Sequence, residues 1–127
     1  MKKNSPKREY KDYILDIYYL TEEIEKFTEG FNFEKFQNDK KTIYAVVRAI
    51  EIIGEAIKNI PSSVKSKHRK IPWRDAADMR NKLIHEYFGV NLKVVWKTVE
   101  KDVPELKNKM LELIKELNIS RKTNRLV

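Results

Sequence analysis

Apolar residues recur every three or four positions along most of this chain, which is the spacing of one face of an α-helix. The first stripe predicts a helix over residues 7–29 that stops at Gly30. Its members are Tyr10, Tyr13, Ile14, Ile17, Leu20, Ile24 and Phe27. Strand-like alternation is absent from the sequence, and only three glycines occur. The pattern therefore predicts an all-α protein.

A second helix is predicted after a connector at residues 31–39, with Asn38 or Asp39 as its cap and Ile60 as its end. One of its faces carries Ile43, Val46, Val47, Ile50, Ile53 and Ile57. A narrower stripe carries Ala45, Ala49, Ile52 and Ala56. A helix that is apolar on two sides is normally central in a bundle or shared with a second protomer.

Further helices are predicted in the second half of the chain. Residues 61–71 form a basic loop, and Pro72 stands near the start of a third helix that ends around residues 88–89. Asn91 can cap a fourth helix, which Val90 and Val95 would brace as a hydrophobic staple. Trp73 and Trp96 have apolar neighbours at helical spacing, and we expect both to be core anchors.

The last predicted helix opens at Pro104. Its buried face is Leu106, Met110, Leu113, Ile114 and Leu117. The chain is then one domain over residues 1–127, a helical bundle of four to five helices, with residues 1–6 and 119–127 as flexible ends.

Composition narrows the function classes. The 127 residues fit one domain with a sizeable core. Because there is no cysteine, the chain has no disulfide framework, thiolate–zinc site or cysteine nucleophile. No signal peptide and no membrane-spanning run is visible, so we expect a cytoplasmic protein without a membrane partner.

The net charge is +8, from 27 Lys and Arg against 19 Asp and Glu, and a balance of this kind favours polyanionic partners. The cations gather at residues 65–70 and 121–125, whereas acidic residues cluster elsewhere, notably at 21–30. This segregation indicates an anionic partner. A well-solvated helical surface is the alternative explanation of the charge.

Three polar residues stand close together in "MRNKLIHEYFGV", residues 79–90: Arg80, His85 and Tyr87. On a regular helix Arg80 and Tyr87 share a face, but His85 lies about 140° away from Arg80. The three groups could meet only at an irregular helix end, or if a second copy supplied some of them across a two-fold interface. The structural alternative is an Arg80 paired with an acid, a His85 that caps the last carbonyls and a Tyr87 in the core.

These residues resemble the R-x-x-x-x-H-x-Y motif of HEPN domains, in the subgroup of HepT-like toxins that pair with minimal nucleotidyltransferase antitoxins. Asn81 matches the polar residue that usually follows the arginine. The stretches at residues 10–17, 48–61 and 71–106 also resemble helices of that subgroup, so the similarity covers most of the chain.

The resemblance implies a dimeric helical bundle that acts as a metal-independent endoribonuclease without a cofactor. It also implies that Arg80 and His85 of both protomers line one cleft, and that the partner enzyme places AMP on Tyr87 to silence the toxin. The residue types suit this chemistry. Imidazole can serve as acid or base near neutral pH, and guanidinium offers a planar set of donors to phosphate oxygens.

Within this interpretation the basic loop is the candidate contact to the RNA backbone, and a mobile, solvated loop is the alternative. The candidate residues are Lys65, Lys67, His68, Arg69 and Lys70. Two other functions stay open: a catalytically inactive bundle that binds RNA or nucleotides, and a dimerisation module for a nucleotidyltransferase. The intact set of Arg80, Asn81, His85 and Tyr87 favours the ribonuclease.

Overall fold

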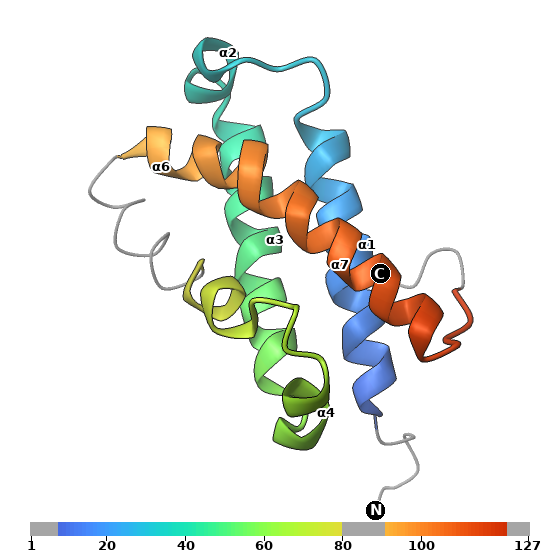
Figure 1. Ribbon diagram of the computed structural model, residues 1–127. Coiled ribbons are helices and arrows are strands. Elements are labelled where there is room, and N and C mark those ends of the chain that lie inside the picture. Colours follow the sequence, from blue (N-terminus) through green and yellow to red (C-terminus); the bar gives the residue numbers. More distant parts are fainter. Residues whose placement is uncertain (1–7, 80–90, 122–127) are drawn as a thin grey trace, which may run out of the picture.

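The computed structural model describes residues 8–79 and 91–121 (Figure 1). These two ranges are helical apart from short turns, and no strand occurs within them. The predicted all-α class is therefore confirmed. No helix in these ranges is both long and apolar enough to cross a membrane.

Two long helices form the centre of the bundle: α1 (Tyr10–Phe27) and α3 (Lys40–Lys58), which run side by side in opposite directions (Figure 1). The predicted stripe of α1 is buried along most of its length, but Phe27 at its end is 37% exposed. Asp39 caps α3, because its carboxylate accepts a hydrogen bond from the Thr42 N–H at 3.0 Å. Both elements follow the predicted pattern closely.

The two apolar faces of α3 differ in burial. The broad face is core, with Val46, Ile50 and Ile53 fully buried. On the narrow stripe Ala49 and Ala56 are also buried within the chain, whereas Ala45 and Ile52 are half-buried. Packing inside one chain thus accounts for only part of this stripe.

The predicted connector at residues 31–39 is wrong, because it contains a short helix, α2 (Phe33–Gln37). The Asn32 side chain caps α2 by accepting a hydrogen bond from the Lys35 N–H at 2.9 Å. Phe36 is completely buried, and its ring centroid lies 5.0 Å from that of Trp96. A helix of five residues is too short to show a period, so its apolar anchor carried the only signal.

The predicted loop at residues 61–71 is also partly helical, since α4 (Ser62–Lys67) begins directly after Pro61. After α4 the chain reverses its direction in a short turn that hydrogen bonds hold in place. The Trp73 indole N–H donates to the carbonyl of His68 at 3.1 Å, and Ile71 and Trp73 are buried. Trp73 is thus the core anchor that the sequence predicts.

The predicted break between a fourth and a fifth helix is absent. Helix α6 (Leu92–Lys97), the π-helical turn η1 (Thr98–Asp102) and α7 (Val103–Glu116) follow one another without a gap. Pro104 is the second residue of α7 and follows directly on η1, whose wider spacing is seen in the hydrogen bond from the Val103 N–H to the Thr98 carbonyl. The helical run changes direction between α6 and α7, and α7 packs across α1 (Figure 1).

The end of α7 is closed by a Schellman motif. Asn118 adopts a φ of 55°, and the N–H groups of Asn118 and Ile119 donate to the carbonyls of Lys115 and Ile114. The following turn brings Arg121 to α1, where its guanidinium donates to the Tyr18 hydroxyl at 3.3 Å. Arg121 therefore has a structural contact within the chain.

Tyr18 is buried, and its hydroxyl donates to the Glu22 carboxylate at 3.1 Å. Burial raises the pKa of Tyr18 above its usual 10.0, and the Glu22 carboxylate adds to this effect. Nearby, the Lys107 ammonium lies 2.7 Å from Glu25, and this hydrogen bond raises the pKa of Lys107. The polar contacts join α7 to α1 beside the apolar core.

Candidate functional site

The four motif residues of the sequence analysis, Arg80, Asn81, His85 and Tyr87, lie outside the described residues, as does Val90 of the predicted staple. The structure describes the chain up to Met79 and again from Asn91. Their catalytic, supporting and modification roles therefore stay predictions. What the structure shows is how the two segments that flank the motif are held.

The segment before the motif, residues 73–79, is helical. Its first hydrogen bond runs from the Ala76 N–H to the Pro72 carbonyl at 2.9 Å, as expected for a proline at a helix start. Trp73, Ala76 and Met79 are buried and share one face at three-residue spacing. The core thus fixes the rotation of this helical segment up to the residue before Arg80.

The segment after the motif is anchored equally firmly. The Asn91 side chain accepts a hydrogen bond from the Val94 N–H at 3.4 Å, which confirms the predicted cap of α6. Val95 is fully buried, and Trp96 packs on Phe36 as predicted for a core anchor. Met79 is thus buried directly before the motif, and Val95 and Trp96 are the first buried residues after it.

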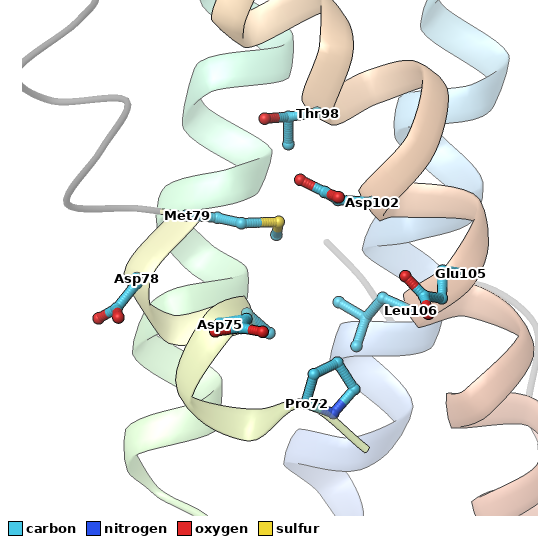
Figure 2. A pocket seen from close by; sticks show the side chains of 9 residues that line it. Pro72, Asp75, Asp78, Met79, Thr98, Asp102, Glu105 and Leu106 are labelled. Carbon is cyan, nitrogen blue, oxygen red and sulfur yellow. The ribbon is translucent and has the colours of Figure 1, made fainter. Parts of the chain in front are cut away.

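An acidic pocket of about 490 Å³ lies between segment 73–79 and the η1–α7 region (Figure 2). Asp75, Asp78, Asp102 and Glu105 line it, and none of these carboxylates bonds to another described residue. Figure 2 shows Met79 pointing from its segment toward Asp102. No lysine, arginine or histidine among the described residues lines this pocket, so the described part of its wall is negatively charged.

The basic residues of the predicted RNA contact are divided by the structure. Lys65 is half-buried on α4, whereas Lys67, Arg69 and Lys70 are exposed around the following turn. His68 is half-buried, and its Nδ1 lies 3.6 Å from a carboxylate oxygen of Glu116 on α7. His68 therefore takes part in a contact between two elements.

A second hollow, of about 160 Å³, lies where this turn meets the C-terminal half of α7. We call it the α4–α7 groove. It is lined by Lys67, His68, Arg69, Lys70, Ile71, Lys109, Glu112, Leu113 and Glu116. The groove is lined by four lysine and arginine side chains and only two glutamates, so its charge balance is opposite to that of the acidic pocket.

The groove and the acidic pocket follow each other along one face of α7. Glu105, Lys109, Glu112 and Glu116 are spaced by three or four residues, so they project from the same side of the helix. Residues 67–71 lie against the end of this face and residues 72–79 against its beginning. Along this face of α7, the hollow beside residues 67–71 is basic. The hollow beside segment 73–79, which precedes the motif in the sequence, is acidic.

Lys109 was missed in the sequence analysis. It is separated from the basic turn by about forty residues, and only the packing of α7 brings it to the groove. The sequence signal that could have indicated Lys109 was its helical spacing to Glu112 and Glu116, which places the three residues on one face of α7. Among the described residues no group of three or more histidines, aspartates or glutamates is arranged to hold a metal ion.

The described residues form a helical bundle, and in the sequence the arginine–histidine–tyrosine motif lies between two helical segments that are anchored in its core. Comparison with known proteins agrees with this class. Residues 17–113 match the family described as Ribonuclease HepT-like, and the chain belongs to this family.

Three curated relatives match this chain over nearly their whole length. The "Probable ribonuclease HepT" of Thermococcus cleftensis is 57% identical over 109 residues, which are 86% of this chain and 99% of that protein. A candidate RNase of Caldanaerobacter subterraneus is 44% identical over 110 residues, with 86% and 95% covered. A candidate RNase of Methanocaldococcus jannaschii is 43% identical over 112 residues, with 88% and 97% covered. No solved structure is significantly similar to this chain.

Family membership and these names support ribonuclease activity for this chain. The resemblance stated from the motif and its neighbouring helices is thereby confirmed at the level of the family.

Proposed function

We propose that this chain is a metal-independent endoribonuclease and the cytoplasmic toxin of a HEPN/minimal-nucleotidyltransferase toxin–antitoxin system. The observation that carries the proposal is the family match over residues 17–113, which includes the R-x-x-x-x-H-x-Y sequence at 80–87. The anchored segments on both sides of the motif support it, because a catalytic constellation must be held by a rigid scaffold.

In the proposed reaction the 2′-hydroxyl of the RNA attacks the adjacent phosphorus, and the bond to the departing 5′-oxygen breaks. His85 of one protomer takes the proton of the 2′-hydroxyl, and His85 of the other protomer gives a proton to the leaving oxygen. Arg80 donates hydrogen bonds to the non-bridging phosphate oxygens, where negative charge builds up. Asn81 supports the motif as a polar neighbour.

A homodimer is part of this proposal for a geometric reason. On a regular helix the side chains of Arg80 and His85 diverge by about 140°, so one helix cannot direct both at the same phosphate. A two-fold axis places the same patch of both protomers face to face, and this gives the cleft two arginines and two histidines.

The direct test is cleavage of a 5′-labelled single-stranded RNA by the full chain in the presence of EDTA. We expect cleavage to continue at the same rate as without EDTA, because acid–base catalysis by His85 uses no metal. A matching 2′-O-methyl RNA should stay intact, because it lacks the attacking hydroxyl. Loss of cleavage in EDTA, or cleavage of the 2′-O-methyl strand, would contradict the mechanism.

We further propose that the partner nucleotidyltransferase silences the toxin by transferring AMP from ATP to the Tyr87 hydroxyl, with loss of the phenolic proton and release of pyrophosphate. A phosphodiester-linked nucleotide would add negative charge and bulk at a cleft that binds phosphates. Co-expression with a minimal nucleotidyltransferase encoded beside this chain should add one adenylate mass to the peptide that contains Tyr87, and Tyr87→Phe should escape this modification. An unmodified wild-type peptide under these conditions would refute the switch.

A further inference from the structure

We infer that the α4–α7 groove is a binding subsite for a backbone phosphate of the RNA substrate, and that Lys109 is one of its ligands. The inference rests on the proposed ribonuclease function, because that function supplies the RNA. It extends the predicted contact from one loop to a hollow between two elements that are distant in sequence.

The groove has a fixed backbone. The carbonyl of His68 accepts hydrogen bonds from the Ile71 N–H at 3.2 Å and from the Trp73 indole N–H at 3.1 Å. Ile71 and Trp73 are buried, and the His68 ring faces Glu116 on the opposite wall. A backbone that is ordered before binding loses less entropy when the ligand arrives. This argues against a merely solvated loop.

The cations of the groove are available to a ligand. Lys67, Arg69, Lys70 and Lys109 make no ion pair or hydrogen bond through their side chains with any described residue. Lys109 is half-buried, so its stem lies against the protein while its ammonium can reach the groove. Four cationic side chains that line one hollow suit a phosphate, which accepts several charge-assisted hydrogen bonds.

The carboxylates set the limits of this subsite. Of the two glutamates, Glu116 lies beside the His68 ring, whereas Glu112 makes no ion pair or hydrogen bond with any described residue. Farther along α7 the four carboxylates of the acidic pocket repel a phosphate. We therefore expect the backbone contact to be confined to the C-terminal half of α7.

The test compares Lys109→Gln with Lys115→Gln in the full chain. Lys115 is an exposed lysine of α7 that does not line the groove, so both variants lose the same charge from the same helix. Affinity for a 2′-O-methyl RNA, which escapes the proposed cleavage, is measured by fluorescence anisotropy at several salt concentrations.

Loss of one phosphate contact should lower the salt slope by about 0.7 and the affinity in 50 mM salt by about eightfold. We expect these losses for Lys109→Gln and near wild-type binding for Lys115→Gln. Glu112→Gln should act in the opposite direction and tighten binding, which a purely structural role of the groove would not produce. Thermal melts of all three variants check that the fold is retained.

Equal losses in Lys109→Gln and Lys115→Gln would overturn the subsite, since they would reflect net charge alone. Wild-type affinity in Lys109→Gln, or no binding of RNA by the wild type, would overturn it as well. Cleavage of unmodified RNA by the wild type is measured separately. Its absence removes the proposed function, whereas intact cleavage with unchanged binding by Lys109→Gln removes only the subsite.

Discussion

Replacement of His85 or Arg80 by alanine is expected to abolish RNA cleavage while the helical bundle stays folded. A positioned general acid or base contributes about 10² to 10⁴-fold, and both proposed proton transfers use His85. The loss should therefore reach at least about 100-fold in the single-turnover rate on a labelled RNA. Arg80→Ala removes the charge that is proposed to face the phosphate in the transition state, and no other group of the motif can replace its planar donors.

Arg74→Ala is the matched control, because Arg74 is an exposed arginine at the start of the helical segment that precedes the motif and lines neither hollow. We expect it to cleave at the wild-type rate. Equal cleavage by wild type, Arg80→Ala and His85→Ala would refute the catalytic assignment. Tight binding of RNA without any product between pH 6 and 8 would instead identify an inactive RNA-binding bundle, since the histidine changes charge in that range.

The same samples test the dimer. Light scattering should give twice the chain mass of 15.2 kDa for the wild type and for both variants, because the substitutions remove reactive groups rather than helices. A monomeric wild type that still cleaves RNA would show that one chain suffices. That result would refute the proposed cleft between two protomers, whereas the proposed ribonuclease activity would be unaffected.

The long elements of this fold could be predicted from the sequence because each repeats its apolar spacing over several turns. Helices α1 and α3 show this most clearly, and their burial follows the predicted stripes. Local chemistry was equally informative at helix starts, where Asp39 and Asn91 cap as expected. These signals depend only on neighbours in the chain.

The short elements could not be predicted, since α2 and α4 have five and six residues and cannot display a helical period. The sequence predicted that a new helix starts at Pro104 after a break. In the structure η1 ends at Asp102 and α7 begins at Val103, so the helical run is continuous at Pro104.

Site prediction had the same limits. The motif at 80–87 is a local pattern and could be recognised in the sequence, but Lys109 joins the basic turn only through tertiary packing. The acidic pocket likewise combines residues of segment 73–79 with residues of η1 and α7. One sequence taken alone contains no record of such pairs, so only the structure could assign them.

The most destabilising single substitution that we predict is Phe36→Ala, in the segment that the sequence indicated as a connector. Phe36 has no exposed surface and packs on Trp96 at 5.0 Å between centroids. Deletion of a fully buried phenylalanine ring costs about 3–5 kcal/mol, out of a total stability of roughly 5–15 kcal/mol for a domain. In urea denaturation, the midpoint concentration of the variant should be lower than that of the wild type, in proportion to this loss of unfolding free energy.

Phe27→Ala is the control, because Phe27 is 37% exposed at the end of α1 and its loss should cost less than about 1 kcal/mol. A Phe36→Ala variant as stable as Phe27→Ala would mean that α2 does not anchor the bundle.

Trp96 belongs to α6, the helix that Asn91 caps directly after the motif. If the contact between Phe36 and Trp96 holds that end of the motif, Phe36→Ala should also lower RNA cleavage at temperatures where the variant is still folded. Cleavage at the wild-type rate in the folded variant would restrict Phe36 to stability.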